Sequence, residues 1–284
     1  MLNNLSYYNQ NNYNIQTPAL SPTTGPAISK PNHKYKPPTF QADVISFKNN
    51  NFLLRTNEFE DYKQRDIKGK EEFYCGPASA ANGIEWLVNN GYPQLKSPNL
   101  IEDLATHFKT DKRGTTATNM CEGLESFCKY KGITPTKVEY QGIMEDPDKY
   151  RIRTHPSINS IKNGIEKNGF VLLNIGVYNK SGSGNNNTYD KDYGHWVTAI
   201  GHFNENGKDY IVIHDPYSKQ KNKNFNLELG KIDQGKLIQH DDNEKSVTDD
   251  AKGFYEAKSD IEYIGKNQAC VITGVVNLEM PPKQ

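Results

Sequence analysis

The 284-residue sequence has no excess charge of either sign, because 34 lysines and arginines balance 34 aspartates and glutamates. It therefore lacks the basic surface with which a dedicated nucleic-acid-binding protein displaces counterions from phosphates. Long apolar runs are missing too: the best candidate, 170–177, is interrupted by Asn174 and falls far short of the roughly 20 residues that cross a bilayer. These absences predict that the protein has no nucleic-acid partner and no membrane partner.

A secretory signal peptide is also missing. The first residues, Met1-Leu-Asn-Asn-Leu-Ser-Tyr-Tyr, have neither a charged n-region nor an apolar h-region. We therefore expect a cytoplasmic protein, or one exported by a route independent of signal peptides, as a secreted effector is. The abundance of asparagine and lysine is typical of a low-GC genome and suggests a bacterial source.

Cysteine is scarce, with four residues in the whole chain, so the sequence does not encode a disulfide scaffold. There is no Cys-x-x-Cys pair and no close group of histidines, and we expect no metal and no organic cofactor. Cys121 and Cys128 lie seven residues apart on one face of a predicted helix, and Cys270 lies in an apolar run. We interpret these three as buried reduced thiols. Cys75 has very different neighbours.

Composition divides the chain into two parts. Residues 1–40 are rich in Asn, Tyr, Ser, Thr and Pro, and we expect them to be disordered because they cannot bury enough apolar surface to offset the entropy of ordering. Residues 41–280 are long enough to form one domain with a single core.

Within this domain, helical patterns precede strand patterns. Apolar residues recur at helical spacing after Cys75, and β-type runs begin at Phe170. This order predicts an α+β fold in which helices are followed by an antiparallel sheet. The first expected helix follows Cys75 and stops at Asn90-Gly91, and the others are 100–108, 115–131 and 157–168. The expected strands are 44–47, 52–55, 170–178, 195–203, 210–214 and 269–277.

Cys75 immediately precedes the first predicted helix, in the segment Tyr74-Cys75-Gly76-Pro77. Free amides and the positive end of the helix dipole favour the thiolate over the thiol. Gly76 would let a substrate backbone approach closely, and Pro77 suits an early helical position. The segment therefore predicts a nucleophile, although a cysteine that merely fills space at a helix start has the same surroundings.

A candidate base and a candidate carboxylate follow on neighbouring strands. His195 opens an apolar strand after Gly194, and Asp215 ends the next strand. A three-residue hairpin at 205–207 would place Asp215 opposite Val197, diagonal to His195 and on the same face. The carboxylate could then accept the imidazole N–H and fix its tautomer. A two-residue Asn-Gly turn would break this parity, and an isolated histidine at a strand start can be purely structural.

With these residues, the sequence resembles a papain-like cysteine peptidase, nearest to the bacteriocin-processing (double-glycine-leader) peptidase family and its stand-alone relatives. The resemblance implies a papain-like fold, with a helical half that bears the nucleophile and an antiparallel sheet that bears the base. It implies Cys75 as nucleophile, His195 as general base and then acid, and Asp215 as the residue that orients the imidazole. The matching motifs are Cys75-Gly-Pro-Ala-Ser, Gly114-Thr, Asn168-Gly-Phe-Val-Leu-Leu, Gly194-His-Trp-Val-Thr-Ala-Ile-Gly and Asp215-Pro-Tyr.

One position departs from the family pattern. The family usually has a glutamine about six residues before the cysteine, which helps to form the oxyanion hole, and this chain has Gly69 there. Gln64 is the nearest upstream glutamine. It could serve if the intervening loop bulges outward, and the amide of Cys75 would contribute in either case.

Three functions fit these residues. The leading hypothesis is a thiol hydrolase that cleaves peptide or isopeptide bonds through a thioester acyl-enzyme, so that its partner is a protein or peptide substrate. The second keeps the acyl-enzyme but has an amine or thiol resolve it, as in transglutaminase-like and phytochelatin-synthase-like enzymes. The third is a non-catalytic binding module on a papain-like scaffold. The oligomeric state is left open.

Overall fold

The computed structural model describes most of the chain beyond residue 60 and two short strands before it. All described residues belong to the second of two units, Phe40–Gln284. The predicted disordered segment 1–40 lies outside the described residues, so the division of the chain at residue 40 stays a prediction. The described residues are 44–47, 50–54, 61–143, 149–220, 223–240, 246–259, 261, 263–265 and 267–283.

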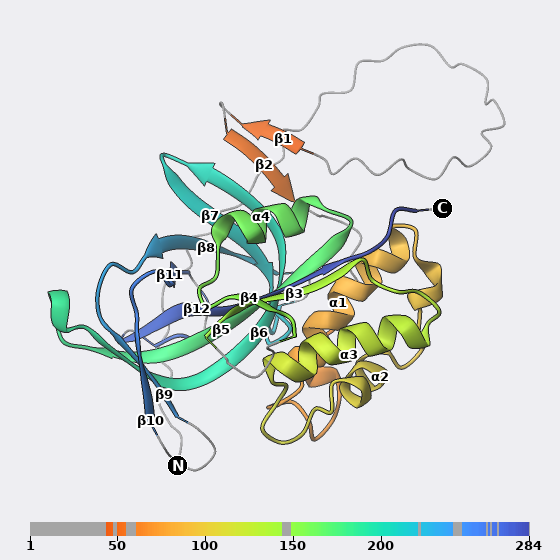
Figure 1. The fold of residues 1–284 in the computed structure, drawn as a ribbon, viewed down its shortest axis with the longest axis horizontal. Coiled ribbons are helices and arrows are strands. Elements are labelled where there is room, and N and C mark those ends of the chain that lie inside the picture. Colours follow the sequence, from red (N-terminus) through yellow and green to blue (C-terminus); the bar gives the residue numbers. More distant parts are fainter. Residues whose placement is uncertain are drawn as a thin grey trace. The chain divides into compact units, whose positions relative to one another are not determined.

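Three helices, α1, α2 and α3, lie together beside the sheet and form the helical half of the fold (Figure 1). α1 ends before Gly91 and α3 before Gly132, two glycines with positive φ that stop each helix without strain. Thr116 begins α3 by accepting a hydrogen bond from the amide of Asn119. Their bounds are α1 Cys75–Asn89, α2 Leu100–His107 and α3 Ala117–Tyr130, with a short 3-10 turn, η2, at Pro93–Leu95.

Six antiparallel strands form a closed barrel, which the sequence did not indicate. Each strand pairs with the next in the order β6, β7, β8, β11, β12, β5, and β5 pairs with β6 again. Alternate side chains fill the barrel with Val, Ile, Leu and Phe. The strands are β5 Gly169–Ser181, β6 Thr188–Glu205, β7 Lys208–His214, β8 Asn224–Lys231, β11 Tyr255–Lys258 and β12 Gln268–Glu279.

The remaining elements extend this barrel. α4 packs on β5, β6 and β12, and its Ile161 and Ile165 join the cluster inside the barrel. The expected antiparallel sheet is correct for the barrel, but β3 pairs with β4 and β6 with β9 in parallel. The elements are β1 Val44–Phe47, β2 Asn50–Leu54, η1 Gln64–Asp66, β3 Lys137–Gly142, β4 Arg151–Arg153, α4 Ile158–Glu166, η3 Gly184–Asn186, β9 Lys236–His240 and β10 Ser246–Asp250.

The hairpin between β6 and β7 corrects one step of the sequence argument. Its turn is the two-residue Asn206-Gly207 type, with both residues at positive φ, and Glu205 pairs with Lys208. A bulge between Ala199 and Gly201 then shifts the register by one residue. Beyond the bulge, Thr198 pairs with His214. The residue after His214 therefore falls opposite Val197, as predicted, because the bulge cancels the effect of the shorter turn.

Buried hydrogen bonds join α1 to β6. The Ser79 hydroxyl donates to the carbonyl of Trp196 over 2.7 Å, and the Thr198 hydroxyl donates to the carbonyl of Ser79 over 2.7 Å. The Trp196 indole N–H donates to the carbonyl of Thr115 over 2.9 Å. Since Ser79 lies one turn after Cys75 on the same helix face, these bonds set the start of α1 against the strand that carries His195.

Candidate active site

Cys75 is the first residue of α1 and is 8% exposed. The first helical hydrogen bond runs from the amide of Ala78 to the carbonyl of Tyr74, so the amides of Cys75 and Gly76 precede the helical ladder. The close approach of a substrate backbone to Gly76 stays a prediction, and the structure gives a second reason for this glycine. A Cβ atom at Gly76 would lie 2.7 Å from the Thr115 hydroxyl oxygen, so this glycine leaves room for Thr115 in the described fold.

His195 and Asp215 meet as a buried pair. His195 Nε2 lies 2.8 Å from Asp215 Oδ1, and Asp215 has no exposed surface. His195 also interacts with Cys75, and each of the two side chains shifts the pKa of the other. Because Nε2 faces the carboxylate, Nδ1 is the ring nitrogen left for the sulfur. The structure thus brings together the three residues that the sequence singled out, although their catalytic roles stay predictions.

The electrostatics of this group favour a thiolate–imidazolium pair. Burial raises the pKa of the Cys75 thiol, but the hydrogen bond and charge of His195, with the amides of Trp196 and Gly76, bring that pKa below its usual value. Burial lowers the pKa of His195, but the charge and hydrogen bond of Asp215, together with Cys75, raise it to about 10. Each charge is therefore stabilised by its neighbour more than it is destabilised by loss of water.

The other three cysteines behave differently. All four thiols are free, as predicted for three of them, and all are buried. Burial raises the pKa of Cys121 and of Cys128 to about 12, and it raises the pKa of Cys270 as well. No histidine of the described residues offsets burial at these positions, so burial keeps these thiols neutral at physiological pH.

Tyr263 is a member of the site that sequence reasoning missed. Its hydroxyl donates to Asp215 Oδ2 over 2.8 Å, while the amide of Tyr217 donates to Oδ1 over 2.8 Å. The rings of Tyr263 and Tyr217 lie 5.5 Å and 6.3 Å from the His195 ring and shield the pair from water. Tyr263 lies in the connection between β11 and β12, 48 residues from Asp215, and no local sequence signal distinguishes it from other tyrosines.

Gln64 is buried in η1 and is 3% exposed. Its amide N–H donates to the carbonyl of Pro216 over 3.2 Å, so η1 lies against the loop that follows Asp215. Its side-chain Nε2 donates to the carbonyl of Glu71, and its Oε1 has no partner among the described residues. Gly69 lies in an exposed turn with positive φ, between Gln64 and the cysteine.

Neighbouring histidines bind other carboxylates. His214 Nε2 lies 2.9 Å from Asp61 Oδ1, and His202 Nε2 lies 2.8 Å from Glu166 Oε1.

The described residues contain no group of three or more His, Cys, Asp or Glu side chains placed to hold a metal ion. No described helix is long and apolar enough to cross a membrane.

A mixed α/β fold that sets a cysteine at a helix start beside a buried His–Asp pair is compatible with a papain-like cysteine peptidase. The model of the Peptidase_C39 like family matches residues 56–233, more than half of the chain, and the chain belongs to this family. The family suggests a cysteine peptidase-type enzyme. A search of curated proteins finds no match. The matched segment contains Gln64, Cys75, His195 and Asp215 and ends before Tyr263.

We expect Cys75 to react selectively with iodoacetamide at pH 6. Its lowered pKa keeps thiolate present where an ordinary thiol, with a pKa of about 8.5, is almost wholly protonated. Peptide mapping by mass spectrometry should show Cys75 alkylated at least about tenfold faster than Cys121, Cys128 or Cys270. In His195→Ala the rate at Cys75 should fall by a similar factor; equal rates in both proteins would contradict the ion pair.

The substitution Tyr263→Phe tests the hydroxyl that holds Asp215. It removes one donor from a carboxylate with no access to water, and such a loss is worth about 1–2 kcal/mol. We expect the alkylation rate of Cys75 at pH 6 to fall about tenfold, with the near-ultraviolet circular dichroism unchanged. Tyr193→Phe is the matched control, since the Tyr193 hydroxyl donates only to the carbonyl of Tyr263. Equal rates in the two variants would leave Tyr263 without a positioning role.

Proposed function

We propose that this chain is a cysteine peptidase that hydrolyses peptide or isopeptide bonds, with Cys75 as nucleophile, His195 as general acid and base, and Asp215 as the residue that orients the imidazole. One observation carries the proposal: the thiol whose pKa is lowered is the one that interacts with the histidine that a buried carboxylate holds. This is the arrangement that activates a thiol at neutral pH.

The first half of the proposed reaction forms a thioester. The Cys75 thiolate attacks the carbonyl carbon of the scissile bond, and the electron pair of the C=O bond moves onto oxygen. The imidazolium of His195 then gives its Nδ1 proton to the leaving nitrogen as the C–N bond breaks. Asp215 stays ionised throughout, because His195, the Tyr217 amide and the Tyr263 hydroxyl all stabilise its charge against the cost of burial.

The second half returns the enzyme to its starting state. Neutral His195 takes a proton from a water molecule, and the resulting hydroxide attacks the thioester carbon. The carboxylic acid product leaves as the C–S bond breaks, and the Cys75 thiolate is regenerated beside the imidazolium. An amine in place of this water would give acyl transfer by the same residues.

The oxyanion is proposed to bind the amide of Cys75 and the side chain of Gln64. The second Nε2 hydrogen of Gln64 remains after the first donates to the carbonyl of Glu71. Burial of Gln64 and the hydrogen bond from its Nε2 to the Glu71 carbonyl hold the side chain in one place, as a preorganised donor requires.

The likeness to double-glycine-leader peptidases extends this proposal to a peptide substrate. It rests on the motifs around Cys75, His195 and Asp215, and it concerns the chemistry rather than a particular leader sequence. We further propose that residues 41–280 form the peptidase domain and that residues 1–40 are a separate polar segment.

Incubation with a library of proteome-derived peptides tests the function. Mass spectrometry should detect new peptide termini with the wild-type protein and none with Cys75→Ala, since removal of the sulfur removes the acyl-enzyme. The control Cys121→Ala removes a thiol that has no imidazole partner and should retain cleavage. Products that carry an added amine in place of a free carboxylate would indicate acyl transfer, and the absence of any Cys75-dependent product would contradict both forms of catalysis.

Gln64→Ala separates oxyanion binding from nucleophile activation. We expect kcat to fall about 100- to 1000-fold, the usual loss for one oxyanion donor. Alkylation by iodoacetamide forms no oxyanion, so its rate at Cys75 should stay within about twofold of the wild type. The matched control is Gln141→Ala, a buried glutamine that binds Ser160 and the amide of Ser157. A parallel loss of both rates in Gln64→Ala would assign Gln64 a structural role instead.

A further inference from the structure

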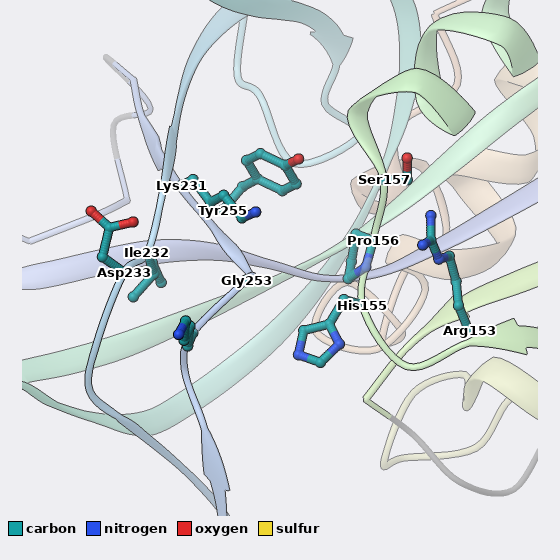
Figure 2. Close-up of a pocket in the computed structure, with 10 residues that line it drawn as sticks. Arg153, His155, Pro156, Ser157, Lys231, Ile232, Asp233, Gly253 and Tyr255 are labelled. Atoms are coloured by element: carbon teal, nitrogen blue, oxygen red, sulfur yellow. The ribbon is translucent and has the colours of Figure 1, made fainter.

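A pocket of about 450 Å³ opens between three segments that take no part in the Cys75 site. One wall is the segment Arg153–Ser157, which precedes α4, and the facing wall is formed by the end of β8 and the start of β11 (Figure 2). None of Cys75, His195, Asp215 and Gln64 lines it. Its volume lies in the range of small-molecule sites.

Both walls are fastened to the fold, so the pocket is preformed. The amide of Ile232 donates to the carbonyl of Phe254 over 2.8 Å, and the amide of Gly253 donates to the carbonyl of Ile232 over 2.9 Å. On the other wall, the amide of Ser157 donates to the side-chain Oε1 of buried Gln141 over 3.0 Å. Backbone held in this way needs little ordering when a ligand binds.

His155 and Gly253 bring the two walls together. The His155 ring packs against buried Phe254 in a tilted arrangement, with ring centroids 4.6 Å apart. Gly253 has a φ of +95°, and a Cβ atom there would lie 3.2 Å from His155 Cδ2. A side chain at this position would therefore strain the turn and crowd His155, which explains the glycine.

The charge of the lining is unbalanced. Arg153, Lys231 and Lys252 line the pocket, and Asp233 is the carboxylate among the lining residues. None of the three cationic side chains forms an ion pair with another described residue. Other lysines of this fold do form ion pairs with carboxylates, as Lys162 does with Asp209 and Lys208 does with Glu228. Three cationic side chains that form no ion pair with a described carboxylate give this concave site a positive potential.

Apolar groups complete the lining. Pro156 and Ile232 are buried, and Tyr255 adds an aromatic side chain. A ligand that satisfies the whole surface therefore has anionic oxygen atoms at one end and a carbon skeleton that contacts these side chains. Arginine and lysine suit carboxylate and phosphate oxygen atoms equally well in charge.

We propose that this pocket binds a small organic anion through Arg153, Lys231 and Lys252, with its carbon skeleton against Tyr255 and Ile232. The site is independent of the Cys75 chemistry, since no residue is shared. Residues 252–255 lie beyond the segment that matches the family model, so part of this site is built by a portion of the chain outside the family match.

Isothermal titration with citrate and with inorganic phosphate tests the proposal, in wild-type protein whose Cys75 has been blocked with iodoacetamide. We expect citrate to bind with one site per chain, and to bind more tightly than phosphate because phosphate has no carbon skeleton. The double variant Arg153→Gln/Lys252→Gln should bind citrate at least about tenfold more weakly, since it loses two charge-assisted hydrogen bonds.

The matched control is Lys96→Gln/Lys112→Gln, which removes the same charge from exposed positions in the helical half and should bind citrate as the wild type does. An equal loss of affinity in both double variants would reveal only nonspecific attraction to positive charge. That result would overturn the proposal. So would the absence of both binding heat and a rise in melting temperature when either anion is present at 10 mM, a concentration about ten times a millimolar Kd.

Discussion

The site depends on the contact between the start of α1 and β6. Ser79 and Thr198 exchange buried hydrogen bonds with the opposite element, and the Trp196 indole bonds to Thr115 ahead of α3. These bonds satisfy polar groups that are buried away from water. Breaking any of them would leave its partner without a hydrogen bond and would cost the free energy of desolvating that group. Cys75 and His195 belong to separate halves of the fold, and this contact helps to set their separation.

Once the halves are joined, burial and pairing act against each other on every charged group of the site. Burial alone would neutralise Cys75, as it does Cys121 and Cys128, whose pKa values it raises to about 12. At Cys75 the imidazolium and two backbone amides outweigh the same cost, and Asp215 in turn sustains the imidazolium. His195 does most to keep the carboxylate ionised, and the Tyr217 amide and the Tyr263 hydroxyl each donate a hydrogen bond to it. The state of Cys75, the proposed nucleophile, thus depends on a series of contacts. Tyr263 binds Asp215, Asp215 binds His195, and His195 acts on Cys75.

Much of this arrangement could be predicted, because helical spacing, strand runs and turn residues are local properties. The four helices and the strands that carry His195 and precede Asp215 are where the patterns indicate. The predicted register between these strands is right, but the three-residue turn on which it was based is wrong. The actual two-residue turn and the bulge at 199–201 compensate for each other. A bulge depends on how a strand meets both neighbours, which alternation along one strand does not encode. Closure of the barrel and the parallel pairing of β9 with β6 are likewise contacts between distant segments.

The sequence has no excess charge, no long apolar run and no paired cysteines, and these absences argued against a nucleic-acid-binding, membrane-spanning or disulfide-rich protein. The order Cys75, His195, Asp215 indicated a thiol nucleophile with a histidine base. Those inferences rest on residue type and nearest neighbours, which can be read directly from the sequence. Tertiary structure alone decided that Gly76 makes room for Thr115, that Gln64 is buried beside the loop after Asp215, and that Tyr263 binds the carboxylate. It also assembled the cationic pocket from three separate segments. Each of these is a contact between residues far apart in the chain, where packing and the satisfaction of buried polar groups choose the partners.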